Sequence, residues 1–578
     1  MTPPPAGVHD PWDSLRQAAE AVRDTILADL GAADAAVPVS EAPESKGLFA
    51  FPAFPLAKAL RRAPNEIAAD IAGRPAPAPF SALVAEGPYV NFREDPGAFA
   101  ALVLASVRAM GESYGVSPER PERVLLEHTS INPTGPIHVG RARNPIYGDS
   151  LARILRLAGC RVTREYLVND VGKQMVLQYW ATKNLSPEDV GPPDRKKDDY
   201  RLVKYYQKAA ALLEERPELN AEVMELIQRF ERGDAALARE VRQVSERVLR
   251  GILESLARID VSYDSFFWES DLILDGRVQN VIERLTPRGR EEDGARYLDL
   301  SAHGLEGDAA KYFFVTRHGT SLYTTRDIAY HLDKMERCDA AINVLGEDQK
   351  LTFQRLKAAF RLLGIDWAPE TLFYAFVGLP EGRLSTRKGL VVYLDDLLDE
   401  AVDRAYAEVS KRREDLPEAR KREIAEFVGV GAVRYNIARV QAEKRILFRW
   451  EEALNFEGSS APFLQYAHAR ACGILDKAGG PAGPGDPRLL VHPGERRLLR
   501  WIAKFPSSVR DAADGRRVHQ VAAFAADFAS VFNEFYRDCP VLSSAADVRA
   551  ARLALVDAAR IVFRNALGCL GLKAPREM

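Results

Sequence analysis

Apolar residues recur along this chain at two different spacings, which divide it into helical and extended stretches. Near the N-terminus, residues 15–30 and 98–110 show the three- and four-residue spacing of amphipathic helices, whereas 47–54 alternates as a strand does. The prolines within 112–123 are typical of a linker. The pattern therefore predicts a small α+β domain over residues 1–112.

The middle of the chain alternates between short apolar runs and helical stretches. Strands are predicted at 124–127, 162–167, 311–316, 340–344 and 373–377, and helices in a stretch that ends near Gly159, at 328–337 and at 353–363. Such alternation is typical of a mostly parallel sheet with helices on its faces. We therefore expect a Rossmann-like core over 123–390 that includes the run 311–316 as one of its strands.

A long charged stretch interrupts this core at about 190–257. Its charge is dense from Asp194 onward, and apolar residues such as Leu202, Tyr205 and Leu212 keep helical spacing. The stretch is longer than a crossover between two strands requires. It is therefore predicted to be a helical insertion whose charges are solvated helix faces, with direct RNA contacts as the alternative.

Helical spacing dominates from 391 to the C-terminus, and the glycine- and proline-rich stretch 479–485 is predicted to be a loop within it. We expect an all-α bundle over 391–578. Aromatic residues cluster in this bundle at Phe463, Tyr466, Phe532, Phe535 and Tyr536. The chain as a whole is predicted to be a multidomain α/β protein.

Composition narrows the classes of protein to consider. The 578 residues suffice for three or four domains, 47% of them are hydrophobic, 28% are charged, and the net charge is −3. This balance argues against a globally basic nucleic-acid coat but permits local basic surfaces. The five cysteines form no Cys-x-x-Cys pair, which argues against a disulfide framework or a zinc site and fits the cytoplasm. No apolar run reaches membrane-spanning length, and the N-terminus lacks the features of a signal peptide.

The first candidate for chemistry is the segment 130–141, which lies between a predicted strand and a predicted helix. Phosphates bind at the helix N-terminus in such a turn. His138 can donate a hydrogen bond to a phosphate oxygen, and Gly140 allows a nucleotide to approach the backbone. An ordinary crossover with a chance histidine is the alternative.

The second candidate is the stretch 381–389, which follows another apolar run. It combines three cations and two hydroxyls between glycines, a composition suited to holding a polyphosphate. A solvated basic turn would have the same composition. Because the two segments occur together and in this order, a nucleotide site is the favoured interpretation.

Together with further stretches, these motifs resemble the class I aminoacyl-tRNA synthetases, and specifically the arginyl-tRNA synthetase family. The similar stretches are 87–92, 130–136, 167–174, 323–331, 385–389 and 466–470. The resemblance implies an arginine–tRNA ligase. Such an enzyme uses ATP to activate L-arginine and transfers it to the 3′ end of tRNA for arginine, releasing AMP and pyrophosphate.

The resemblance also implies an ATP site. His138, Gly140 and Arg141 would serve the α-phosphate, and Arg383, Ser385, Arg387 and Lys388 would serve the β- and γ-phosphates. The chain departs from the common family pattern, because Arg141 stands where a second histidine is usual and Thr386 stands where a second lysine is usual. Lys388 is the best candidate for the missing cation. Mg²⁺ is expected only as an ion carried by ATP, with no tightly bound metal.

A guanidinium substrate requires carboxylates in a planar arrangement. Tyr323 and Asp327 lie four residues apart, so on a helix they share a face. The resemblance places both in the arginine pocket. With them it places Ser130, Asn132, Glu269 and Asp348 or Gln349. The alternatives are a helix-internal partner or a cap for Asp327, and a structural role for Glu269.

The resemblance assigns RNA contacts to both ends of the chain. The C-terminal bundle is expected to bind the anticodon through Tyr466, His468, Arg470 and Tyr536, although some of its aromatic residues should be core. Tyr89, Asn91 and Phe92 are expected to touch the outer corner of the tRNA. The protein is expected to be a monomer that activates arginine only when tRNA is bound.

Two other interpretations stay open from the sequence. One is a class I ligase for glutamine, glutamate or cysteine. The other is a catalytically silent RNA-binding paralogue, which the replacement of histidine by Arg141 suggests.

Overall fold

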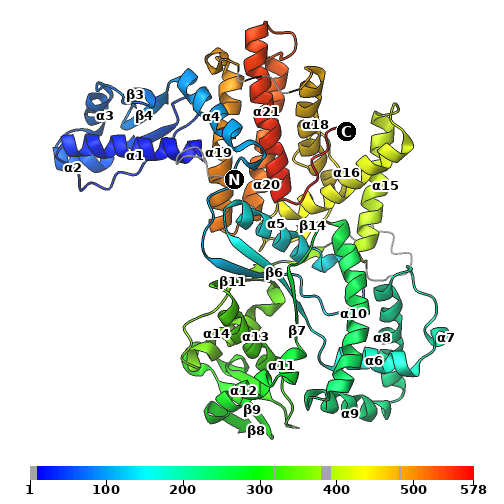
Figure 1. Ribbon diagram of the computed structural model, residues 1–578. Coiled ribbons are helices and arrows are strands. Elements are labelled where there is room, and N and C mark those ends of the chain that lie inside the picture. Colours follow the sequence, from blue (N-terminus) through cyan, green and yellow to red (C-terminus); the bar gives the residue numbers. More distant parts are fainter. Residues whose placement is uncertain (1–9, 318, 379–391, 481–482, 484) are drawn as a thin grey trace. The chain divides into compact units, whose positions relative to one another are not determined.

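The structure is a computed structural model that describes residues 10–317, 319–378, 392–480, 483 and 485–578. The chain divides into two compact units (Figure 1). We call residues 120–156 and 160–454 the central unit, and residues 1–119, 157–159 and 455–578 the terminal unit.

The central unit is built on a parallel sheet with the strand order β12–β11–β5–β6–β7. Its strands are β5 Arg123–Glu127, β6 Arg161–Val168, β7 Ser265–Trp268, β11 Ala340–Gly346 and β12 Glu370–Tyr374. From β5 the chain builds the sheet in one direction through β6 and β7, and β11 and β12 then extend it on the other side. The predicted Rossmann-like core is therefore confirmed. Its topological switch point lies between β5 and β11, where ligands of such sheets bind at the carboxyl ends.

Helices connect these strands, and the spacing predicts the three that correspond to the stretch ending near Gly159, to 328–337 and to 353–363. The connecting helices are α5 Arg143–Leu157, α11 Asp271–Leu274, α12 Arg277–Leu285, α13 Tyr323–Arg337 and α14 Lys350–Leu362. Helix α13 packs on a cluster of buried side chains that includes Ile328 and Tyr330 of its own sequence and Leu356 and Phe360 of α14. This packing fixes the orientation of α13 beside the sheet.

The prediction that the run 311–316 belongs to the parallel sheet is wrong. Strand β10 Lys311–Val315 pairs antiparallel with β9 Ala295–Asp299, which in turn pairs with β8 Gly289–Glu292. The turn between β8 and β9 is Asp293-Gly294, and both residues have positive φ, 51° and 76°. Asp-Gly is the typical two-residue hairpin turn, so β8 and β9 form a local antiparallel pair, to which β10 adds as the third strand.

The predicted helical insertion is confirmed between β6 and β7. It comprises α6 Lys173–Asn184, α7 Pro187–Val190, α8 Asp198–Glu215, α9 Leu219–Glu231 and α10 Ala235–Arg258. Its helices share their own core, which contains Val176, Trp180, Val223, Phe230 and Val241. The insertion is thus a packed body rather than a loop.

Two further long helices, α15 Leu394–Arg412 and α16 Glu418–Ala438, belong to the central unit. The short elements β13 Val377–Gly378, β14 Ile446–Leu447 and α17 Trp450–Ala453 accompany them. The central unit extends to Leu454, whereas the sequence predicts that a new domain begins at 391. The predicted domain limits stay predictions, but α15 and α16 pack with the sheet.

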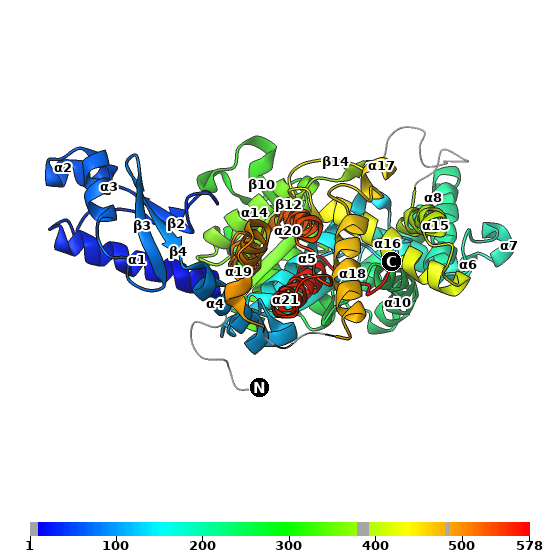
Figure 2. The same ribbon diagram turned by 90° about the horizontal axis from the view of Figure 1, so that it is seen from above.

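The terminal unit combines an α+β part and a helical part. The first has an antiparallel sheet in the order β1–β2–β4–β3. Its elements are α1 Pro11–Asp29, β1 Ser40–Glu41, β2 Phe49–Pro52, α2 Ala57–Leu60, α3 Pro64–Ala72, β3 Phe80–Glu86, β4 Tyr89–Glu94 and α4 Pro96–Met110. Figure 2 shows α1 running along this sheet. The expected small α+β part is therefore present.

The helical part consists of α18 Ala461–Lys477, α19 Pro493–Asp514, α20 Val518–Asp538 and α21 Ala546–Cys569. Figure 2 shows these helices nearly end-on as a bundle. Arg500 of α19 is buried and donates to the carbonyl oxygens of Gly47 (2.7 Å) and Ala42 (2.6 Å). Because a buried guanidinium requires such partners, Arg500 ties the bundle to the α+β part within this unit.

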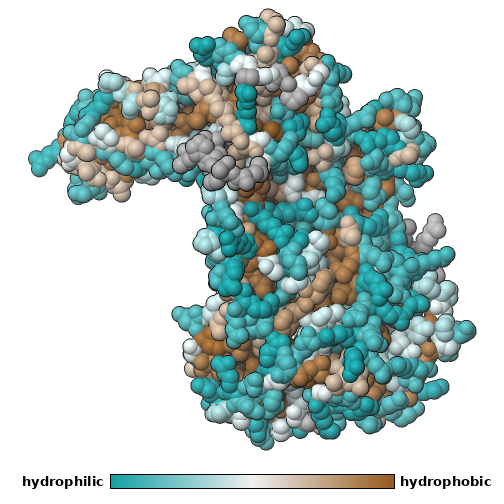
Figure 3. Space-filling view, in the orientation of Figure 1, coloured by the Kyte–Doolittle hydropathy of each residue, from teal (hydrophilic) through white to brown (hydrophobic). Residues whose placement is uncertain are grey.

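The surface seen in Figure 3 is covered mostly by hydrophilic side chains, with hydrophobic ones in separate patches. None of the described helices combines the length and the apolar content that crossing a bilayer requires.

Our first prediction concerns a buried ion pair in the central unit. Arg434 of α16 donates to Asp149 of α5 over 2.6 Å, and both side chains are fully buried. Arg434→Met should cost about 3 kcal/mol, because it removes the fully buried guanidinium from a carboxylate that stays in the interior with Arg153 as its other partner. The urea midpoint of the circular dichroism signal measures this change.

Arg420→Met is the matched control, because Arg420 lies on the same helix and its partner Glu423 is exposed. It should change stability by less than about 1 kcal/mol. Equal midpoints for the two variants would contradict the structural importance of the buried pair.

Candidate active site at the switch point of the sheet

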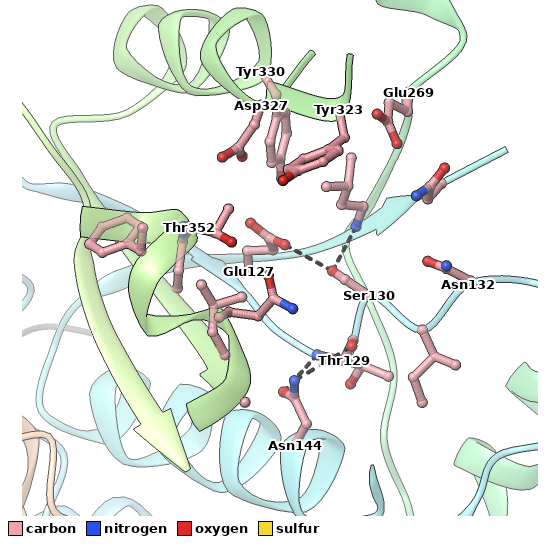
Figure 4. A pocket seen from close by; sticks show the side chains of 18 of the residues that line it. Glu127, Thr129, Ser130, Asn132, Asn144, Glu269, Tyr323, Asp327, Tyr330 and Thr352 are labelled. Atoms are coloured by element: carbon pink, nitrogen blue, oxygen red, sulfur yellow. Dashed lines mark hydrogen bonds between the residues drawn. The ribbon is translucent and has the colours of Figure 1, made fainter. Parts of the chain in front are cut away.

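A cavity of about 680 Å³ opens at the carboxyl ends of the central strands (Figure 4). Its lining comes from β5 and the turn after it, from α13, and from the segment that follows β11. The polar residues among them are Glu127, Thr129, Ser130, Asn132, Thr134, Arg141, Asn144, Asn169, Gln174, Glu269, Tyr323, Arg326, Asp327, Tyr330, His331, Asn343, Asp348, Gln349, Thr352 and Tyr374. The cavity is where a switch point predicts a ligand site.

The turn after β5 has an unusual backbone. Thr129 and Ser130 both have positive φ, 73° and 42°, a conformation that non-glycine residues rarely adopt. Asn144 of α5 stabilises it, because its Oδ1 accepts from the Thr129 amide at 2.7 Å and its Nδ2 donates to the Val344 carbonyl at 3.0 Å. Asn144 thereby links the strands on either side of the switch point. The sequence did not identify this residue.

The same turn directs Ser130 into the cavity. Its hydroxyl donates to Glu127 Oε1 (3.0 Å) and accepts from the Leu167 amide (3.2 Å). Figure 4 shows both hydrogen bonds at the centre of the site. Strained backbone of this kind occurs where surrounding contacts over-determine a functional geometry.

Helix α13 presents Tyr323, Asp327 and Tyr330 to the cavity (Figure 4). The prediction that Tyr323 and Asp327 share one helix face is confirmed. Tyr323 is 54% exposed, and its ring borders the opening. Asp327 also has the helix-internal partner that was the alternative, because its Oδ1 lies 3.1 Å from Nδ1 of His331.

Hydrogen bonding below Asp327 identifies the protonated nitrogen of His331. Lys334 is fully buried, contacts Glu127 and donates to Asn343 Oδ1 at 2.8 Å. The Asn343 amide nitrogen therefore faces His331 Nε2 (2.9 Å) and donates to it. In neutral His331 the proton consequently lies on Nδ1, where it points to the carbonyl oxygen of Asp327 (2.8 Å) and to its carboxylate. This network holds the carboxylate in place.

Glu269 follows β7 and is 8% exposed. Burial raises the pKa of its carboxyl, and Arg326 opposes that effect by donating from Nε to Oε1 at 2.6 Å. Arg326 is itself buried on α13 and also lines the cavity. Glu269 therefore has a structural cation as its partner, which favours the structural role that the sequence left open.

Every residue that the resemblance assigns to the arginine pocket lies in this cavity. They are Ser130, Asn132, Glu269, Tyr323, Asp327, Asp348 and Gln349. Asn132 donates to Gln174 at 3.3 Å, a neighbour that the sequence did not identify. The structure thus brings together residues that are separated by more than two hundred positions.

The structure places only some of the residues that are predicted to bind ATP. Arg141 lines the cavity, but His138 and Gly140 do not. The His138 ring accepts at Nδ1 from the Gly140 amide (2.9 Å). Partial burial, and then the nearby Arg141, lower the pKa of His138. The neutral ring therefore carries its proton on Nε2, from which it can donate to an anion.

Gly140 has a role beside the histidine, and its predicted contact with a nucleotide stays a prediction. A Cβ there would lie 3.0 Å from His138 Nδ1, so the missing side chain makes room for the histidine ring. Arg383, Ser385, Arg387 and Lys388 lie outside the described residues. The described residues on either side of this segment contact the turn that carries His138. Val377 lies close to Gly140, and the backbone of Tyr393 pairs with that of His138.

The residues predicted to contact RNA fall into two groups. Tyr89, Tyr466 and Tyr536 are each nearly half exposed. The Arg470 guanidinium lies 4.7 Å from the ring centre of Tyr466 and 4.6 Å from that of Tyr536, so its planar face is stacked. The three tyrosine rings are available at the surface, whereas Arg470 is half-buried and its Nη1 donates to Asn533.

The other predicted RNA contacts are corrected by their burial. Asn91 donates to the Val84 carbonyl (3.2 Å), and Phe92 packs against Phe51 and Phe80 in the α+β core. His468 is 3% exposed and bonds the Pro575 carbonyl through Nδ1 (2.8 Å). These side chains support the fold, because both their surfaces and their polar atoms are already engaged. Phe532 and Phe535 are likewise core residues.

No group of three or more His, Cys, Asp or Glu side chains in the described part of the chain is placed to hold a metal ion.

Models of known families match the chain over three stretches. The model described as tRNA synthetases class I (R), catalytic domain, matches residues 104–450. The arginyl tRNA synthetase N terminal domain matches 13–93, and the DALR anticodon binding domain matches 464–578. The catalytic-domain match covers most of the central unit, and the other two matches lie in the terminal unit.

Individual proteins resemble the chain over nearly its whole length. The arginine–tRNA ligase of Methanocella arvoryzae is 46% identical over 528 residues, which cover 91% of this chain and 92% of that protein. That of Methanothermobacter thermautotrophicus is 46% identical over 529 residues, with the same coverage of both chains. The solved structure of Thermus thermophilus arginyl-tRNA synthetase superposes with a TM-score of 0.81 at 30% identity and covers 98% of this chain and 100% of that one.

Our second prediction concerns the strained turn. Asn144→Ala would leave the buried Thr129 amide without its acceptor, at a cost of about 1–3 kcal/mol. Hydrogen exchange of the peptide spanning 127–132 should then accelerate. Asn220→Ala on α9 serves as the control, because Asn220 only bonds a nearby carbonyl on the same helix end. Unchanged exchange in the Asn144 variant would show that Asn144 does not hold the turn.

Proposed function

Because this chain belongs to the arginyl-tRNA synthetase family of class I aminoacyl-tRNA synthetases, we propose that the cavity at the switch point is where arginine binds and is activated. The chain is an arginine–tRNA ligase, and arginine, ATP and tRNA are its substrates. The observation that carries the proposal is how the carboxylates of the cavity are paired.

Four carboxylates line the cavity: Glu127, Glu269, Asp327 and Asp348. Glu127 contacts the buried ammonium of Lys334, and Glu269 pairs with Arg326. Within the described residues, neither Asp327 nor Asp348 forms an ion pair with a lysine or arginine of the chain. A cationic side chain entering the cavity would find these two carboxylates available, which suits a guanidinium.

Asp327 is the stronger of these two candidates. Its carboxylate is held by His331, and the ring of Tyr323 stands one helical turn away on the same face. A planar guanidinium can pair with the carboxylate while it stacks on the ring. A neutral side chain would leave Asp327 unpaired, and an acidic one would be repelled, which accounts for selection against glutamine and glutamate.

Activation requires the arginine carboxylate to attack the α-phosphate of ATP and expel pyrophosphate. The protein aligns the reactants and stabilises charge on the phosphate oxygens. His138 is proposed to donate from Nε2, and Arg141 to connect the arginine cavity with the phosphates. Arg383, Ser385, Arg387 and Lys388 are proposed to contact the β- and γ-phosphates, with Mg²⁺ carried by ATP. The position of their flanks beside His138 supports this arrangement.

The terminal unit is proposed to bind the tRNA. Tyr466, Arg470 and Tyr536 form an exposed stack on which unpaired anticodon bases can lie. Tyr89 and its neighbour Phe54, whose ring centres are 6.1 Å apart, are exposed on the α+β part and suit the outer corner of the tRNA. We further propose a monomer that acts in the cytoplasm.

Our third prediction tests Asp327. Asp327→Asn keeps the shape of the side chain and removes its charge, so kcat/KM for arginine should fall by about 100-fold or more. Aminoacylation of tRNA at varied arginine concentrations measures the effect. Glu336→Gln removes a charge from an exposed position of the same helix and should leave kcat/KM within about twofold of the unchanged protein. An unaltered kcat/KM in the Asp327 variant would remove Asp327 from the substrate site.

Our fourth prediction concerns the order of events. We expect arginine-dependent exchange of pyrophosphate into ATP to be negligible in RNA-free protein and to appear when tRNA for arginine is added, because tRNA binding populates the competent state. Removal of the 3′ adenosine should abolish the stimulation. Robust exchange without RNA would contradict this coupling. Absence of exchange in both conditions, with tRNA binding retained, would indicate a silent RNA-binding paralogue.

A further inference from the structure

One carboxylate of the insertion, Glu231, is the last residue of α9 and contacts residues at the beginning of α13, beside the substrate cavity. Its side chain is 7% exposed although it ends a helix whose other acidic residues, such as Glu222 and Glu225, face solvent. Burial of a carboxylate is unfavourable unless its oxygens are paired. Both oxygens of Glu231 are paired, and both partners lie at the beginning of α13.

The first partner is Arg326. Its Nη1 donates to Glu231 Oε1 at 3.0 Å, while its Nε donates to Glu269 Oε1 at 2.6 Å. The second partner is Ser321, whose hydroxyl donates to Glu231 Oε2 at 2.7 Å. Arg326 Nη1 also lies 3.2 Å from the Ser321 hydroxyl, so the three side chains form a closed hydrogen-bonded ring.

Two members of this ring are neighbours in the sequence of the residues proposed to recognise the guanidinium. Ser321 lies two residues before Tyr323, and Arg326 is adjacent to Asp327 in the sequence. Ser321 and Arg326 are both anchored to α9, so the first turn of α13 has a fixed position relative to the insertion. Glu231 itself does not line the cavity, so it must act through these neighbours.

Glu231 also sets the charge behind the cavity. Arg326 with Glu269 alone would be a neutral pair, and Glu231 gives the group a net charge of −1. A cationic substrate gains from that charge, because the site is partly shielded from solvent. Without Glu231, Arg326 would pair with one carboxylate only, and its positive charge would repel the guanidinium of the substrate.

We propose that Glu231 is a positioning residue for arginine binding, through which the helical insertion sets the charge and the geometry of the substrate cavity. The inference rests on the proposed arginine site and assigns part of its selectivity to a domain outside the sheet.

The test compares Glu231→Gln, Glu231→Asp and Glu222→Gln in the full-length chain, by aminoacylation of tRNA with arginine and ATP varied separately. Glu231→Gln keeps hydrogen-bonding capacity and removes the charge, so KM for arginine should rise about tenfold while KM for ATP and kcat stay within about twofold. Glu231→Asp keeps the charge on a shorter side chain and should recover part of the loss. Glu222→Gln makes the same charge change at an exposed position of α9 and should behave as the unchanged protein.

The split between KM and kcat separates positioning from mere support of the fold. A variant that is partly unfolded loses kcat through fewer active molecules and keeps its KM for arginine, and that result would overturn the proposal. An unchanged KM with unchanged kcat would overturn it as well. The unchanged protein is assayed alongside, because its failure to charge tRNA with arginine would refute the proposed function instead.

Discussion

Every charge buried around the cavity needs a partner inside the protein, and this constraint shapes the whole site. Burial of an unpaired ion costs several kcal/mol, so the buried Lys334 and Arg326 depend on carboxylates that accept from them, Glu127 for Lys334 and both Glu269 and Glu231 for Arg326. Within the described residues, that pairing leaves Asp327 and Asp348 without a lysine or arginine partner. The proposed site for a cationic amino acid rests on these two carboxylates.

The sequence predicted the framework well, because helix and strand periodicity is local information. The parallel sheet, the helical insertion and the common face of Tyr323 and Asp327 all follow from spacings of two to four residues. The strand at 311–316 was assigned to the wrong sheet, since periodicity identifies a strand but not its neighbour. The Asp293-Gly294 turn indicates the hairpin of β8 and β9, but not that β10 pairs with β9.

Pairings between distant segments were beyond the sequence. Glu269 and Arg326 are 57 positions apart, and Arg326 and Glu231 are 95 apart. Nothing in the sequence around Glu269 indicates that its carboxylate pairs with a buried arginine. The same limit explains why Asn91, Phe92 and His468 were predicted to contact RNA although they are buried. An aromatic or polar residue in a motif shared with a family can lie in the core or at the surface. Among the predicted RNA contacts, Tyr89, Tyr466 and Tyr536 have the exposure that stacking on a base requires.

The position of the insertion beside the site allows one of its side chains to contact α13. The insertion enters the chain between β6 and β7, beside the carboxyl ends of the strands, and Glu269 follows β7 directly. A packed body at this position can present a charged side chain to α13 from outside the sheet, which no loop of crossover length could hold rigidly. Because the insertion has its own core, the position of α9 depends on many apolar contacts rather than on the ion pair itself. The ion pair can then transmit that position to the beginning of α13, where Tyr323 and Asp327 are the residues proposed to contact the substrate.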